Sequence, residues 1–125
     1  MTSSEIGKLG EESVCRYLVE HGYSIAARNY RIRGGEIDII ACNGDYIAFV
    51  EVKTRKKDSL VSGFEAVSKR KQSLIIRTAA DYCIKHPTVL QPRFDVAEVI
   101  AENGVVLSID YINNAYDTTG CNIIF

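Results

Sequence analysis

The sequence predicts a single α/β domain in which helices flank a mixed β-sheet, with elements in the order α-β-β-β-α-β-β. Two segments, residues 4–21 and 64–85, carry apolar side chains at helical spacing. They separate two groups of short apolar segments that are typical of strands, so both helices can pack on one sheet. The length of 125 residues, of which 46% are hydrophobic, is enough for one such domain with an ordinary core.

The first helix is expected over residues 4–21. Ser3 or Ser4 can cap its N-terminus, and Gly22 is a suitable stop at its C-terminus. On a helical wheel, one arc gathers the side chains expected to face the sheet. These are Leu9, Gly10, Ser13, Val14, Tyr17, Leu18 and His21.

Three strands are expected to follow this helix. Residues 23–32 form the first strand, which ends at the Gly-Gly turn of residues 34–35. Residues 36–53 form a β-hairpin, because two apolar segments flank the Asn-Gly-Asp sequence at 43–45, a strong hairpin turn.

The second helix is expected over residues 64–85, after a basic loop at 54–62, and it ends before Pro87. Its apolar face gathers Val67, Leu74, Ile75, Thr78 and Tyr82.

Two further strands, 93–101 and 105–112, are expected to form a second hairpin across an Asn-Gly turn. We assign residues 1–112 to one domain and leave the structure of the tail, residues 113–125, unassigned.

Composition favours a soluble cytoplasmic protein. No apolar segment approaches the roughly 18–20 residues of a membrane span, and residues 1–10 lack the apolar core of a signal peptide. Because nothing marks the chain as secreted, we expect its four cysteines to be reduced thiols.

The net charge of −1 conceals an asymmetry. Residues 28–71 contain ten Lys and Arg against six Asp and Glu, whereas the rest of the chain contains five against ten. A concentration of positive charge favours a polyanionic partner. An ordinary solvated basic face accounts for the same pattern equally well.

Three charged residues stand out in the predicted hairpin. Asp38 interrupts an apolar run, and Glu51 and Lys53 lie two apart on the other strand, where they share one face. Folding about the 43–45 turn brings Asp38 near residue 51. Two converging carboxylates form a hard-oxygen site suited to Mg²⁺ or Mn²⁺, and a neighbouring lysine can stabilise charge on a phosphate. The alternative is an exposed Glu–Lys pair of about 0–1 kcal/mol.

These residues resemble the core of the PD-(D/E)xK nuclease superfamily, in which an Asp is followed at a distance by Glu-x-Lys. The segments GEESVCRYLVEHGY, IDIIACNG and FVEVKTR resemble archaeal Holliday-junction resolvases. The whole combination, as far as about residue 112, is similar to the YraN-like family of small bacterial proteins. The superfamily's proline before the Asp is replaced here by Ile37. The resemblance implies a restriction-endonuclease-like mixed sheet.

The resemblance also implies roles. Asp38 and Glu51 would bind the metal with the Val52 carbonyl, and Lys53 would be the catalytic lysine. The helix glutamate of the resolvases corresponds to Glu11, which borders the apolar face of the first helix. The alternative for Glu11 is a solvated carboxylate.

Further polar residues surround this predicted site. Lys71 lies on the apolar face of the second helix, where it either reaches the site with Gln72 or snorkels to solvent. Glu36 is expected to pair with Arg33 rather than bind metal. The candidate phosphate-positioning residues are Arg31, Arg33, Arg55, Lys56 and Lys57.

We therefore expect an Mg²⁺- or Mn²⁺-dependent endonuclease that hydrolyses DNA phosphodiester bonds, with branched or damaged DNA among the candidate substrates. Two alternatives are a nucleic-acid-binding module of the same fold with little or no cleavage, and a structural or regulatory domain with a vestigial site. The intact Asp38, Glu51 and Lys53 set argues against the last. Symmetric cutting of two strands would require a homodimer.

Overall fold

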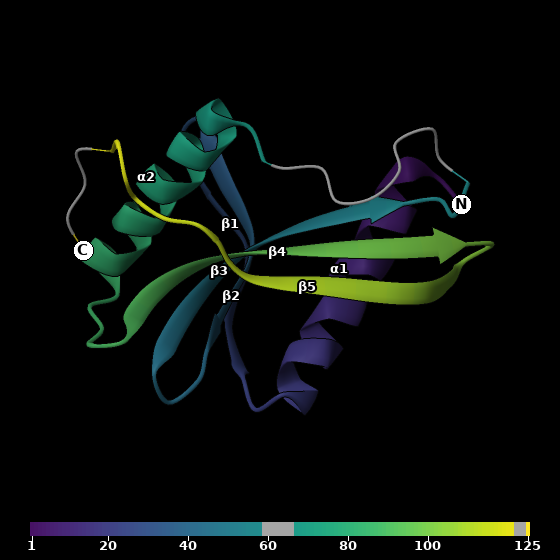
Figure 1. The fold of residues 1–125 in the computed structure, drawn as a ribbon, viewed down its shortest axis with the longest axis horizontal. Helices are drawn as coiled ribbons and strands as arrows, with labels where there is room; N and C mark the ends of the chain where they lie inside the picture. Colours follow the sequence, from purple (N-terminus) through teal and green to yellow (C-terminus); the bar gives the residue numbers. More distant parts are fainter. Residues whose placement is uncertain (59–66, 122–124) are drawn as a thin grey trace.

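The computed structural model describes residues 1–58, 67–121 and 125, and it confirms the α/β class and the element order. Five strands form one mixed sheet in the order β1-β2-β3-β4-β5, with a helix on each face (Figure 1). The elements are α1 Ser3–Glu20, β1 Ser24–Ile32, β2 Gly35–Cys42, β3 Tyr46–Arg55, α2 Lys69–Lys85, β4 Gln91–Glu102 and β5 Val105–Tyr116.

The N-terminus of α1 is set by a capping box. The Thr2 hydroxyl accepts a hydrogen bond from the Glu5 N–H at 3.2 Å, and the Glu5 carboxylate accepts one from the Thr2 N–H at 3.0 Å. The expected cap at Ser3 or Ser4 is therefore wrong by one or two residues, because Thr2 with Glu5 satisfies two helix-end donors at once.

The helix α2 begins later than expected. Its N-cap is Ser68, whose hydroxyl accepts a hydrogen bond from the Lys71 N–H at 3.2 Å, so the first helical residue is Lys69 rather than about residue 64. Val67 is buried but precedes the helix. Residues 64–66 of the expected helix lie outside the described residues.

Both predicted hairpins are present. The strands β2 and β3 pair antiparallel around residues 43–45, and β4 and β5 pair antiparallel around residues 103–104. The strand β5 continues to Tyr116, beyond the expected end at residue 112. The strands β3 and β4 are parallel neighbours. The connection between them includes α2 and brings the chain back to the end of the sheet where β3 begins.

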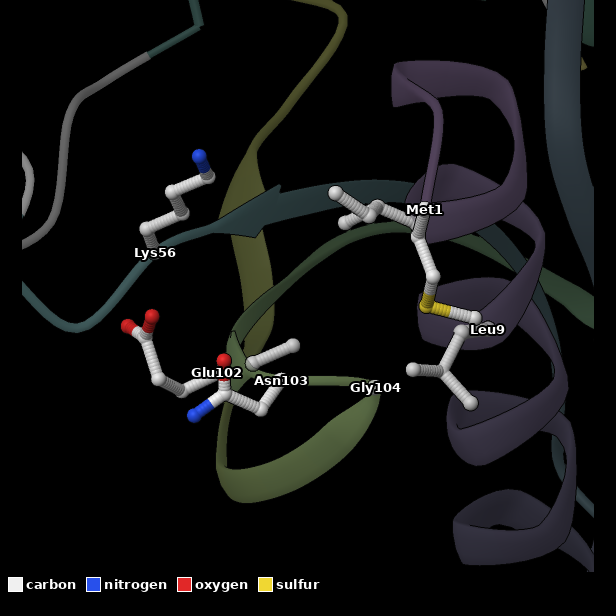
Figure 2. A pocket seen from close by; sticks show the side chains of 8 residues that line it. Met1, Leu9, Lys56, Glu102, Asn103 and Gly104 are labelled. Carbon is white, nitrogen blue, oxygen red and sulfur yellow. The ribbon is translucent and has the colours of Figure 1, made fainter.

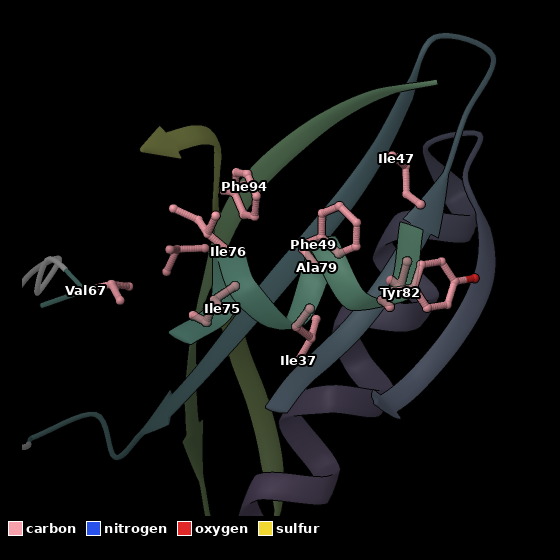
Figure 3. Close-up of a cluster of buried hydrophobic side chains, with 11 residues drawn as sticks. Ile37, Ile47, Phe49, Val67, Ile75, Ile76, Ala79, Tyr82 and Phe94 are labelled. Atoms are coloured by element: carbon pink, nitrogen blue, oxygen red, sulfur yellow. The ribbon is translucent and has the colours of Figure 1, made fainter. Parts of the chain in front are cut away.

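Each face of the sheet has its own core. On the α2 face, Phe49, Phe94 and Tyr82 pack with aliphatic side chains of α2 and β2 (Figure 3). On the α1 face, Val14 and Leu18 pack on buried residues of β2, β3 and β4. No helix in the described ranges is long and apolar enough to cross a membrane.

The helix α1 approaches the end of β3 very closely at Gly10. A Cβ atom added to Gly10 would lie 1.9 Å from the Thr54 hydroxyl oxygen, well inside van der Waals contact. Only glycine permits this approach. The contact fixes the N-terminal half of α1, including Glu11, beside the last residues of β3.

Candidate metal centre

The sheet divides at the point where the predicted site lies. The pairing of β2 with β3 runs from Cys42 and Ile47 to Ile39 and Val50 and then stops. Beyond that point β2 pairs only with β1, and β3 pairs only with β4. We call this divergence the fork. The first residues past the last pair are Asp38 and Glu51, one on each strand, so the fork brings together the two carboxylates that the hairpin register predicts.

Where β2 and β3 separate, the Val52 N–H of β3 has no backbone acceptor on β2. The side chain of Asp38 accepts its hydrogen bond instead. Its Oδ2 accepts a hydrogen bond from the Val52 N–H at 2.8 Å. Burial raises the pKa of Asp38 to about 7, and the negative charge of Glu51 adds to the increase, while the Val52 N–H opposes it. Charges on Glu11 and Glu36 contribute smaller increases. Two carboxylates in this geometry repel each other, which favours a cation between them.

Glu51 is buried, with 7% of its surface exposed, and its carboxylate forms an ion pair with a lysine of α2. The Lys71 ammonium nitrogen lies 2.5 Å from Glu51 Oε1. Burial tends to lower the pKa of Lys71, but the hydrogen bond to Glu51 and the charges of Glu51, Asp38 and Glu36 outweigh it and raise the pKa. A hollow of about 180 Å³ at the fork is lined by Gly34, Gly35, Glu36, Asp38, Glu51, Lys71, Leu74 and Ile75.

Lys53 lies on the same face of β3 as Glu51, two residues further from the fork. It is half-buried, and its neighbour in the parallel pairing with β4 is Glu98, which is buried. Lys53 does not line the hollow that holds Asp38, Glu51 and Lys71. Lys71 contacts a fork carboxylate directly.

Glu11 lies on α1, which covers the opposite face of the sheet from α2. It is half-buried and lines two surface hollows next to the fork, one shared with Val52 and one shared with Arg31 and Glu36. Its charge contributes to the raised pKa of Asp38. The structure thus places Glu11 beside the fork without bringing it into the same hollow as Asp38.

The basic side chains are distributed around the fork. Arg31 forms an exposed ion pair with Glu36 at 3.4 Å, because the two residues are cross-strand partners. The expectation that Glu36 pairs with Arg33 is therefore wrong, since Arg33 lies exposed in the β1–β2 turn. The side chain of Gln72 forms a local contact, because its amide donates a hydrogen bond to the Val67 carbonyl at 2.9 Å.

The remaining basic candidates lie at the end of β3 and just beyond it. Arg55 is its last residue and is half-buried, and Lys56 and Lys57 follow it exposed. Lys56 lines the hollow of about 430 Å³ in Figure 2, between the start of α1 and the β4–β5 turn. This hollow shares no lining residue with the hollow at the fork.

A buried charge network on β4 was assigned no role from the sequence. Asp95 is fully buried and accepts hydrogen bonds from the Arg93 guanidinium, at 2.8 Å for the shortest, and from the Tyr111 hydroxyl at 2.6 Å. The Asn114 N–H and the contact between Arg93 and Tyr23 complete the network. The acidic residues Asp95 and Glu98 interrupt an apolar strand just as Asp38 does, so the criterion applied to Asp38 would have found them.

Tyr116 also went unnoticed. Within the described ranges, its hydroxyl is the buried side-chain polar atom without a hydrogen-bond partner. Burial raises the pKa of Tyr116, and the charges of Glu51 and Asp95 add to the increase, so the phenol lies within electrostatic reach of the fork.

The donor set at the fork suits a hard divalent cation. The described part of the chain has no group of three or more His, Cys, Asp or Glu side chains arranged to hold a metal. Mg²⁺ does not need one, since it binds through one or two carboxylates, several waters and substrate phosphate. Asp38 and Glu51 supply two carboxylates, and a cation relieves both the burial of charge and the repulsion by Glu51 that raise the pKa of Asp38.

Comparison with known proteins adds a family. The model of the family described as "Uncharacterised protein family UPF0102" matches residues 10–99. A UPF0102 protein of Alkaliphilus metalliredigens is 46% identical over 115 residues, which cover 91% of this chain and 99% of the relative. UPF0102 proteins of Dictyoglomus thermophilum and Trichlorobacter lovleyi are 40% identical over 118 residues and 44% identical over 116 residues, with at least 90% of each chain covered.

Proposed function

The chain belongs to the UPF0102 family, as its YraN-like resemblance predicts, and we propose that it is an Mg²⁺- or Mn²⁺-dependent endonuclease that hydrolyses DNA phosphodiester bonds. One observation carries the proposal. Asp38 and Glu51, 13 residues apart in sequence, converge at the fork, and the pKa of Asp38 is raised to about 7. A carboxylate pair of this kind, with lysines on the same strand as Glu51 and on α2, is suited to metal-assisted phosphodiester hydrolysis.

In this proposal Asp38 and Glu51 hold the cation, with the Val52 carbonyl as a further ligand. The bound cation would supply an activated water and neutralise charge on the phosphate. The Val52 N–H keeps the Asp38 carboxylate oriented through its 2.8 Å hydrogen bond. Lys53 stabilises the negative charge that develops on the phosphate, since its ammonium shares the face of β3 with Glu51.

The protein would also orient the nucleic acid. Arg31, Arg33, Arg55 and Lys56 contact phosphates, which gives affinity without sequence information. Glu11 adds negative charge beside the fork and so strengthens the preference for a cation there. The protein would act in the cytoplasm. It would act as a homodimer where it cuts both DNA strands.

A second candidate function is a nucleic-acid-binding module of the same fold that cleaves little or not at all. The ion pair between Lys71 and Glu51 favours it, because the ammonium already neutralises one of the two carboxylates. The two candidates differ in whether divalent cations bind at the fork and whether strands are cut.

A cleavage assay with Mg²⁺ and Mn²⁺ on branched, single-stranded and duplex DNA tests the proposal. Asp38→Asn and Lys53→Ala should each abolish most of the cleavage. Asp45→Asn is the matched control, because Asp45 is exposed in the turn at the other end of the same hairpin. DNA binding without cleavage on any substrate would favour the binding module. Equal cleavage by Asp38→Asn and the unmodified protein would place the activity elsewhere.

A further inference from the structure

The ion pair between Lys71 and Glu51 at the fork joins two elements that are distant in sequence. The Lys71 ammonium on α2 lies 2.5 Å from Glu51 Oε1 on β3, and both residues line the hollow at the fork. The Glu51 side chain is 8% exposed, whereas the Lys71 side chain is 53% exposed. The carboxylate is therefore fixed in the sheet, and the lysine reaches it from solvent along a flexible stem.

The position of Lys71 on its helix is electrostatically unfavourable without Glu51. The first turn of α2 carries Lys69, Arg70 and Lys71 and no acidic residue. The N-terminus of a helix is the positive end of its dipole, so cations there are disfavoured. The ammonium is held by the carboxylates at the fork, and whatever neutralises those carboxylates weakens that hold.

We propose that Lys71 is an exchangeable counterion, which occupies Glu51 until a divalent cation binds and then transfers to a substrate phosphate. This inference rests on the proposed function and gives Lys71 a substrate-binding role within it. Asp38 and Glu51 carry two negative charges when both are ionised. One ammonium and one divalent cation together carry three positive charges, which is more than the two carboxylates neutralise. Lys71 and the cation therefore compete for Glu51 in the free protein, and a phosphate supplies the negative charge that accommodates both.

Calorimetry with Mn²⁺ alone tests the competition. We expect Lys71→Met to bind Mn²⁺ about tenfold more tightly than the unmodified protein, the scale of one unit charge a few ångströms from the cation in a partly exposed site. Lys69→Met is the matched control, since it removes the same charge from the same helical turn without the contact to Glu51. Its Mn²⁺ affinity should stay within about twofold of the unmodified protein.

A short phosphorothioate oligonucleotide, which resists cleavage, tests the transfer to phosphate. The oligonucleotide should increase the Mn²⁺ affinity of the unmodified protein more than that of Lys71→Met. The tenfold difference in Mn²⁺ affinity between the two proteins should therefore become smaller. Lys71→Arg, which keeps the charge, should behave like the unmodified protein in both measurements. If Lys71→Met is unstable without a cation, the increase in its melting temperature on adding Mn²⁺ should exceed that of Lys71→Arg.

The outcomes separate this inference from the function on which it rests. Equal Mn²⁺ affinities of Lys71→Met and Lys69→Met would overturn the exchange and leave the metal site standing. A difference that the oligonucleotide does not narrow would overturn the transfer to phosphate. Absence of Mn²⁺ binding in every variant would overturn the metal site itself, and the exchange with it.

Discussion

Neutralising Asp38 should make the metal-free protein more stable at alkaline pH. The pKa of Asp38 rises from 3.8 to about 7 on folding, mainly through burial and the charge of Glu51. A raised carboxyl pKa means that the folded state binds the proton more tightly than the unfolded state. The contribution to stability is therefore complete below about pH 4 and is lost as the pH rises through about 7.

The magnitude follows from the two pKa values. At 1.36 kcal/mol per pH unit, Asp38 lowers the free energy of unfolding by about 3 kcal/mol between pH 5 and pH 8. This is an upper value, because the hollow at the fork admits water that screens part of the repulsion. Asp38→Asn keeps an oxygen that accepts from the Val52 N–H and removes the titration.

Urea unfolding at pH 5 and pH 8, in the presence of a chelator, measures the effect. The unmodified protein should lose stability between the two values, and Asp38→Asn should lose about 3 kcal/mol less. Addition of Mn²⁺ at pH 8 should restore stability to the unmodified protein and leave Asp38→Asn unchanged. Asp45→Asn should follow the unmodified protein. Parallel pH profiles for the unmodified protein and Asp38→Asn would refute the reasoning.

Four further outcomes are expected. Lys53→Ala should reduce cleavage on the order of 10²–10³-fold, while unfolding experiments show a change within about 1 kcal/mol and calorimetry shows undiminished Mn²⁺ affinity. Combined Arg55→Ala and Lys56→Ala should flatten the dependence of DNA affinity on salt by roughly one unit per lost phosphate contact; a salt-insensitive interaction would contradict a DNA footprint. Tyr116→Phe should stabilise the protein by about 1 kcal/mol in urea unfolding, because it removes a buried hydroxyl without a partner. Gly10→Ala should lower the melting temperature and the cleavage rate together, because α1 must then move away from β3.

The features that sequence patterns predict well here are local ones. The Asn-Gly turn at residues 43–45 determines how the two strands of its hairpin align, and alternation along each strand determines the faces. The convergence of Asp38 and Glu51 follows from these two rules. The confirmed element order follows from the same periodicities, since each helix and strand is recognisable within its own segment.

The features that escaped prediction depend on contacts between distant segments. The wheel places Lys71 on the apolar face of α2, but its pairing with Glu51 depends on how α2 crosses the sheet. The partner of Glu36 depends on the register of β1, where Arg31 rather than Arg33 lies opposite. The start of α2 depends on which serine caps the helix. The apolar residues before Ser68 continue the helical pattern, so the local sequence does not identify Ser68 as the cap.

The division of the sheet at the fork has a consequence for how the chain acquires its site during folding. The β2–β3 hairpin closes over residues 43–45 alone, whereas the parallel pairing of β3 with β4 joins residues 45 apart, such as Tyr46 and Gln91. Short loops close fastest, and parallel pairing must await the crossover. Asp38 and Glu51 are thus brought together by a local hairpin, whereas Lys71 reaches them only when α2 docks. The chain acquires its repelling carboxylates before their counterion, so divalent cations should accelerate refolding by neutralising them at that stage.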